Sequence, residues 1–145
     1  MFLKLSKALW VLSVVCVFAN LLYVYASLPP EQVIVQETAS GNTYVSREVV
    51  FYISLTFILI INVLVFLIGA IQKQNERFRG WFNGLVITLN IFTILALGAL
   101  SVINSNEHYD FSRLGYFLYG SLGLILVWTL TWPLWALFQK KIAKD

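Results

Sequence analysis

The sequence predicts an all-α integral membrane protein: a four-transmembrane-helix bundle with a short β-hairpin-like segment outside the membrane, between the first two helices. Two observations predict this fold class. First, the 145 residues are 59% hydrophobic and only 12% charged, and a soluble domain carries about twice that charged fraction. Second, four uncharged stretches, residues 8–30, 49–72, 80–106 and 114–139, each exceed the roughly 20 residues that a helix needs to cross a bilayer. We expect one membrane domain over residues 1–145.

The first helix is expected at residues 8–28, after a basic start that contains Lys4 and Lys7. Its apolar part runs for about twenty residues, which is longer than the apolar region of a cleaved signal peptide. We therefore expect this helix to be retained. Pro29 and Pro30 should end it, because neither residue can continue the helix.

The outer segment, residues 29–47, is predicted to hold a two-stranded hairpin. The runs Val-Ile-Val at 33–35 and Thr-Tyr-Val at 43–45 favour strands, and Ser-Gly-Asn at 40–42 favours a turn. The hairpin should lie over the outer ends of the helices, with Val33, Val35 and Tyr44 as its candidate partner surface. The alternative is a loosely ordered connector, because an isolated hairpin is only marginally stable.

The remaining helices are expected at residues 49–71, 81–103 and 114–138, joined by a turn at 72–80 and an outer loop at 104–113. Ser46 is suited to cap the second helix, because a serine hydroxyl can accept a hydrogen bond from a first-turn backbone N–H. The 72–80 turn is short, so the second and third helices should pack antiparallel.

Charge placement predicts the orientation in the membrane. Eight of the ten basic residues lie on the side that holds both termini and the 72–80 turn: Lys4, Lys7, Lys73, Arg77, Arg79, Lys140, Lys141 and Lys144. Short basic segments stay in the cytoplasm. We therefore expect a multi-pass protein of the bacterial inner (cytoplasmic) membrane, with both termini cytoplasmic and the outer segment facing out.

Three asparagines interrupt the apolar helices: Asn20, Asn62 and Asn90, one in each of the first three. A carboxamide in hydrocarbon needs a hydrogen-bond partner, so these side chains should face other helices. Asn62 and Asn90 lie at similar depth, and we expect them to meet. Interhelical packing is the main interpretation, and a polar substrate site in the bundle is the alternative.

Aromatic and basic side chains gather toward the cytoplasmic end. We interpret five residues as anchors at the inner interface: Arg77, Arg79, Trp81, Trp132 and Trp135. Within the fourth helix, Pro133 removes a backbone donor, and a kink is expected there. Trp128 shares one stripe with Trp132 and Trp135. Lipid-facing anchorage together with packing is the main interpretation of this stripe, and a partner or cofactor surface is the alternative.

The residue types present argue against catalysis. No acidic, basic or histidine side chain lies inside the four predicted spans, although proton relays and ion pathways use such groups. The single cysteine, Cys16, excludes a CxxC motif. Three weak metal ligands occur together at Glu107, His108 and Asp110, in what should be a solvated loop where Asp110 or Ser112 caps the fourth helix. We expect no enzyme, no catalytic residue, no cofactor and no metal.

The outer segment resembles a known bacterial module. Its Leu28-Pro29, its Glu31-Gln32-Val33, its Gly41 and the basic residue before the next helix are similar to the extracytoplasmic signature of SdpI-type immunity and signalling proteins. In that signature a proline and a histidine usually occupy the places of Ile34 and Gln36, and an aspartate follows the glycine. The resemblance covers about the first seventy residues and implies an immunity or signalling role, without transferring any functional residue. The whole chain also looks like small four-span proteins of bacterial inner membranes.

Together these observations favour a structural or accessory subunit of a membrane complex, without catalytic activity. Its expected partners are the lipid bilayer and other membrane-protein subunits, or further copies of the chain in a homo-oligomer, with no nucleic acid. One alternative is an immunity-like or envelope-sensing protein whose outer segment meets a toxin, a peptide or a partner. The third is a passive transporter or pore lined by the asparagines.

Overall fold

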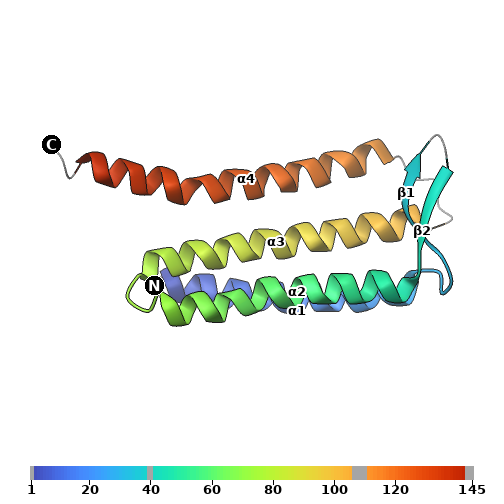
Figure 1. Cartoon of the computed structure of the whole chain (residues 1–145), viewed down its shortest axis with the longest axis horizontal. Coiled ribbons are helices and arrows are strands. Elements are labelled where there is room, and N and C mark those ends of the chain that lie inside the picture. The colour runs from blue at the N-terminus through green and yellow to red at the C-terminus, as the bar shows by residue number, and fades with distance from the viewer. Residues whose placement is uncertain (1, 39–40, 106–110, 143–145) are drawn as a thin grey trace.

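The computed structural model describes residues 2–38, 41–105 and 111–142 (Figure 1). In chain order the elements are α1 (Phe2–Ser27), β1 (Val33–Thr38), β2 (Gly41–Val45), α2 (Arg47–Ile71), α3 (Glu76–Ile103) and α4 (Phe111–Ile142). Four helices in the described part of the chain are long and apolar enough to cross a membrane. The predicted bundle of four apolar helices with a two-stranded hairpin is confirmed at this level, and it indicates a multi-pass membrane protein.

The helices extend beyond the apolar stretches that predicted them. α1 already begins at Phe2, before Lys4 and Lys7, and α3 begins at Glu76. A helix ends where its backbone bonding is capped rather than where its side chains become polar. Ser46 caps α2 by accepting from the N–H of Val49 at 3.4 Å, as expected. Asn75 caps α3 by accepting from the N–H of Phe78 at 3.0 Å.

α3 is the central helix, with α1, α2 and α4 packed around it (Figure 1). α1 and α3 run in the same direction, because Ser6 contacts Asn83 and Ser13 contacts Asn90, each pair 77 residues apart. The contacting residues recur every seven positions in both helices. This spacing is typical of the left-handed packing of coiled coils and membrane bundles.

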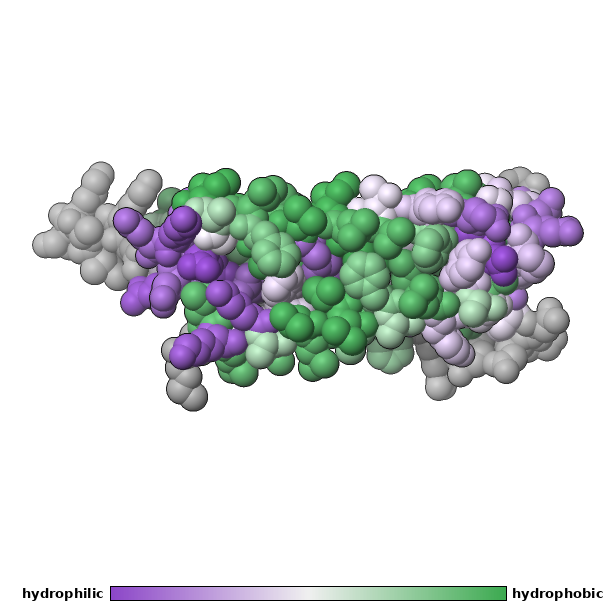
Figure 2. Space-filling model, turned by 90° about the horizontal axis from the view of Figure 1, so that it is seen from below, coloured by the Kyte–Doolittle hydropathy of each residue, from purple (hydrophilic) through white to green (hydrophobic). Residues whose placement is uncertain are grey.

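The interior divides into an apolar half and a polar half. The apolar core lies toward the hairpin and consists of Val17, Leu21, Val24, Leu28, Val33, Ile58 and Leu97. Most buried polar side chains, among them Ser6, Ser13 and Asn83, lie from the middle toward the other end, which holds the start of α1 and the end of α4. Outside, hydrophobic side chains fill the middle of the molecule and hydrophilic groups gather at both ends (Figure 2).

The hairpin is docked on the bundle. β1 and β2 pair antiparallel, from Val33 opposite Val45 to Thr38 opposite Gly41. Gly41 has a φ of 137°, a conformation that glycine adopts far more readily than other residues. Asn104, which caps α3, accepts from the N–H of Ile34 at 2.7 Å and donates to its carbonyl at 2.9 Å. One side chain thus pairs with β1 as a neighbouring strand would.

α4 is the least buried helix. In its most apolar stretch of 18 residues, 6% of the residues are buried, compared with 33% in the corresponding stretch of α3. In the described part of the chain, its only extensive helix contact is with α3. α4 continues through Pro133 as one helix and is gently bowed rather than broken (Figure 1). Its exposed apolar surface is therefore large.

Candidate functional site

The first candidate site is a polar network inside the bundle. Asn62 and Asn90 exchange two hydrogen bonds, at 3.0 and 3.1 Å, which join α2 to α3. Trp10 donates its indole N–H to Asn62 Oδ1 at 2.8 Å, and Asn90 donates to the hydroxyl of Ser13 at 2.9 Å. The second amide hydrogen of Asn62 goes to the carbonyl of Ile58 at 2.8 Å. The structure therefore brings the two predicted asparagines together and ties both to α1.

The amide groups in this network are satisfied. Both side chains are buried, and Asn90 is completely so. A buried amide without partners costs free energy, whereas a connected network holds its members in one arrangement. Its amide, indole and hydroxyl groups are all neutral at physiological pH. The network is therefore suited to holding three helices together. It contains no ionisable acid or base and no activated nucleophile.

Two further polar residues show where the network ends. Asn83 lies one heptad before Asn90 and donates to the hydroxyl of Ser6 at 3.3 Å. Asn20, in contrast, keeps a buried Oδ1 without a hydrogen-bond partner in the described part of the chain. Asn83 thus extends the link between α1 and α3, and Asn20 stands outside it.

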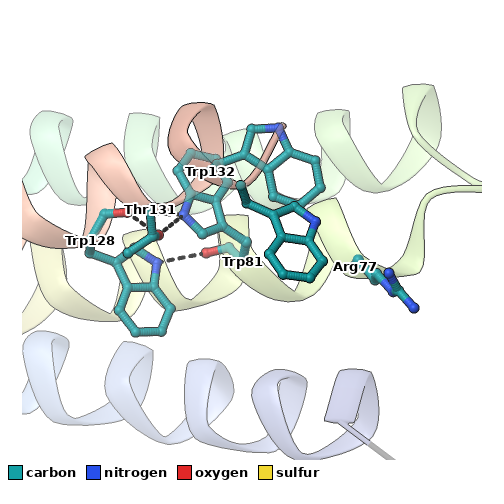
Figure 3. Close-up of a pocket in the computed structure, with 6 residues that line it drawn as sticks. Arg77, Trp81, Trp128, Thr131 and Trp132 are labelled. Atoms are coloured by element: carbon teal, nitrogen blue, oxygen red, sulfur yellow. Dashed lines mark hydrogen bonds between the residues drawn. The ribbon is translucent and has the colours of Figure 1, made fainter. Parts of the chain in front are cut away.

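The second candidate site is an aromatic cavity between α3 and α4 (Figure 3). Its volume is about 410 Å³, and it is lined by Arg77, Trp81, Trp128, Thr131, Trp132 and Trp135. Trp81 donates its indole N–H to the carbonyl of Trp128, and Trp128 donates to the carbonyl of Trp81, both at 3.0 Å. We call this reciprocal pair the tryptophan clasp.

The tryptophan clasp depends on a notch in α3. A Cβ atom at Gly84 would lie 2.3 Å from Cζ2 of Trp128, so a larger residue leaves no room for the ring. Thr131 also accepts from Trp81 at 3.0 Å. The ring of Phe78 lies 5.4 Å from that of Trp81 and 4.9 Å from that of Trp132. The clasp and its aromatic neighbours hold α4 against α3.

Within the tryptophan stripe, Trp128 packs against α3 through the tryptophan clasp, whereas Trp135 is about half exposed. The structure corrects one expectation about the outer segment. Val33 is completely buried in the core and does not belong to an exposed partner surface. Val35 and Tyr44 are exposed.

The reason for the error at Val33 is a β-bulge. The pairing shifts between Ile34 and Gln36, which leaves Val35 as the extra residue. In a regular strand residues 33 and 35 would share a face, but a bulge redirects the side chain.

The predicted basic residues lie at the end of α3 that adjoins the aromatic cavity. Arg77 lines the cavity, and Arg79 donates to the carbonyl of Lys73 at 3.3 Å. Glu107, His108 and Asp110 lie outside the described residues, so their expected loop and cap are not addressed. Among the residues that the structure describes, no group of three His, Cys, Asp or Glu side chains is placed to hold a metal.

Comparisons with protein-family models, with curated proteins and with solved structures find no match for this chain. The resemblance of the outer segment to SdpI-type proteins therefore stays a prediction. Function has to be argued from the two sites and from the exposed surfaces.

Proposed function

We propose that this chain is a small structural or accessory subunit of a larger membrane complex, without catalytic activity of its own. The observation that carries the proposal is the exposure of α4, which packs along α3 and leaves most of its apolar surface uncovered. Gly120 and Gly123 lie on that surface, and nothing occupies the 4 Å around the position of a Cβ atom at either. Such positions allow a second helix to approach closely.

The interior supports the same proposal. A transporter or pore needs a polar path that a substrate can enter. Here Asn62 and Asn90 spend their hydrogen bonds on each other and on α1. An interior of this kind gives a rigid unit whose outer faces remain available for neighbours.

We further propose that the helices span the bacterial inner membrane with both ends of the chain in the cytoplasm. Most of the described basic residues lie at the end opposite the hairpin, in the start of α1, the turn before α3, the first residues of α3 and the end of α4. Short cytoplasmic segments carry such residues. In a Cys16→Ala background, a cysteine at exposed Gln32 should react with an impermeant maleimide on intact spheroplasts. A cysteine at exposed Gln74 should react only after lysis. The reverse pattern would invert the orientation.

The assembly proposal is tested by purification in mild detergent with light scattering and mass spectrometry. The native chain should elute as a complex of fixed stoichiometry, with other subunits or with further copies of itself. Gly120→Leu combined with Gly123→Leu should lower the fraction in the complex about tenfold, which corresponds to ~1.4 kcal/mol, because bulk blocks close helix contact.

Leu122→Phe is the matched control, because it adds bulk to α4 about 160° around the helix from Gly120. It should leave the complex intact, and all variants should melt like the native chain when isolated. A native chain that stays a lone monomer in several mild detergents would contradict the subunit role.

A further inference from the structure

The aromatic cavity has two kinds of wall. The clasp residues Trp81 and Trp128 spend their indole N–H groups on each other's carbonyls, so toward the cavity they offer apolar ring faces. Trp132 and Trp135 have no hydrogen-bond partner in the described part of the chain, and their N–H groups remain available. The cavity can therefore hold an apolar chain and also donate hydrogen bonds.

The same cavity has one cation at its edge. Arg77 lies one turn before Trp81 on α3, so both side chains emerge on one face of the helix. Arg77 is exposed and has no ion-pair or hydrogen-bond partner among the described residues. An unpaired guanidinium and free indole N–H groups that line the same cavity are together complementary to an oxyanion such as phosphate.

The position of the cavity selects the source of that anion. The cavity is lined by the start of α3 and the second half of α4, at the end of the molecule where the start of α1 and the turn with Lys73 also lie (Figure 1). This is the level where tryptophan and arginine meet lipid headgroups in a bilayer. A soluble anion would leave the ring faces uncovered, whereas a phospholipid carries its phosphate and its apolar chain together.

We propose that this cavity is a binding site for one phospholipid with an anionic headgroup. The phosphate is held by Arg77 and by the indole N–H groups of Trp132 and Trp135. The adjoining acyl chain lies against the rings of Trp81 and Trp128. This proposal rests on insertion of the helices in a bilayer but needs no protein partner. Lipid binding can therefore be disproved without disproving the subunit role.

The test is native mass spectrometry of the purified protein in an equimolar mixture of phosphatidylglycerol and phosphatidylcholine. We expect one tightly held phosphatidylglycerol, preferred over phosphatidylcholine. Arg77→Gln should lower the bound phosphatidylglycerol about fivefold, as expected for the loss of one charge near a headgroup. Trp135→Leu should lower the bound fraction of both lipids, because it removes a wall and a donor.

Lys73→Gln is the matched control, because it removes an equal charge from an exposed side chain outside the aromatic cavity. It should change binding by less than about twofold. Millimolar inorganic phosphate should not displace the lipid. Equal losses of bound phosphatidylglycerol in the Arg77 and Lys73 variants would mean that the lipid is attracted by the overall positive charge and not by this site. Displacement by inorganic phosphate would mark a soluble-anion site. Either result, or equal binding of both lipids, overturns the proposal.

Discussion

Asn90→Leu is expected to destabilise the isolated protein by about 2 kcal/mol in mild detergent. The change removes three hydrogen bonds, two with Asn62 and one with Ser13, and an intramembrane bond averages about 0.6 kcal/mol. It also leaves the buried carboxamide of Asn62 partly unpaired. Thermal melting followed by circular dichroism measures the loss.

Thr88→Val is the matched control on the same helix. Thr88 is also buried, but its hydroxyl donates to the carbonyl of Leu85 within α3. Its removal should cost less than about 1 kcal/mol, because no contact between helices is lost. Equal destabilisation by the two changes would show that the network does not join the helices.

A double-mutant cycle gives a sharper test of the same contact. Asn62→Leu and Asn90→Leu together should cost less than the sum of the single changes, because each single change already removes the bonds between them. Full additivity would mean that the two carboxamides do not meet in solution.

Contacts of the polar network could be predicted from the sequence where a single side chain or a short turn determines which residues meet. The contact between Asn62 and Asn90 could be predicted from the sequence, because a tight turn makes the two helices antiparallel and places the two residues at similar depth in the membrane. Trp10 and Ser13 could not be added, because their contacts, with Asn62 on α2 and Asn90 on α3, depend on which face α1 turns toward these two helices. The signal that could have found Ser13 is the seven-residue spacing shared by Ser6 and Ser13 with Asn83 and Asn90.

Two residues show a second limit. Val33 and Val35 were both expected on an exposed partner surface, but a bulge separates them, and Val33 is buried while Val35 is exposed. Trp128, expected in a stripe that both anchors and packs, lies against α3 because Gly84 leaves room for its ring. A single bulge or glycine notch changes which face a side chain takes without changing the hydrophobic pattern around it.

The notch at Gly84 leads to a prediction that the same glycine-to-alanine change affects stability differently at two positions of α3. Gly84→Ala should destabilise the protein by about 1–3 kcal/mol, because the new Cβ overlaps a ring that is fixed by its bond to Trp81. Gly98→Ala on the same helix should be neutral or stabilise by up to about 1 kcal/mol, because nothing lies within 4 Å of its Cβ position. Melting of the two variants measures both effects.

Gly84→Leu should go further and separate the end of α4 from α3, because α3 is the only helix that α4 contacts extensively in the described part of the chain. Spin labels on cysteines at Gln74 and Phe138, both exposed, should report a longer and broader distance distribution by electron paramagnetic resonance. Adding Trp128→Ala should shorten the distance again, because the space that leucine needs is then vacant. If Gly84→Leu and Gly98→Leu change the distances equally, the tryptophan clasp is not what holds the fourth helix in place.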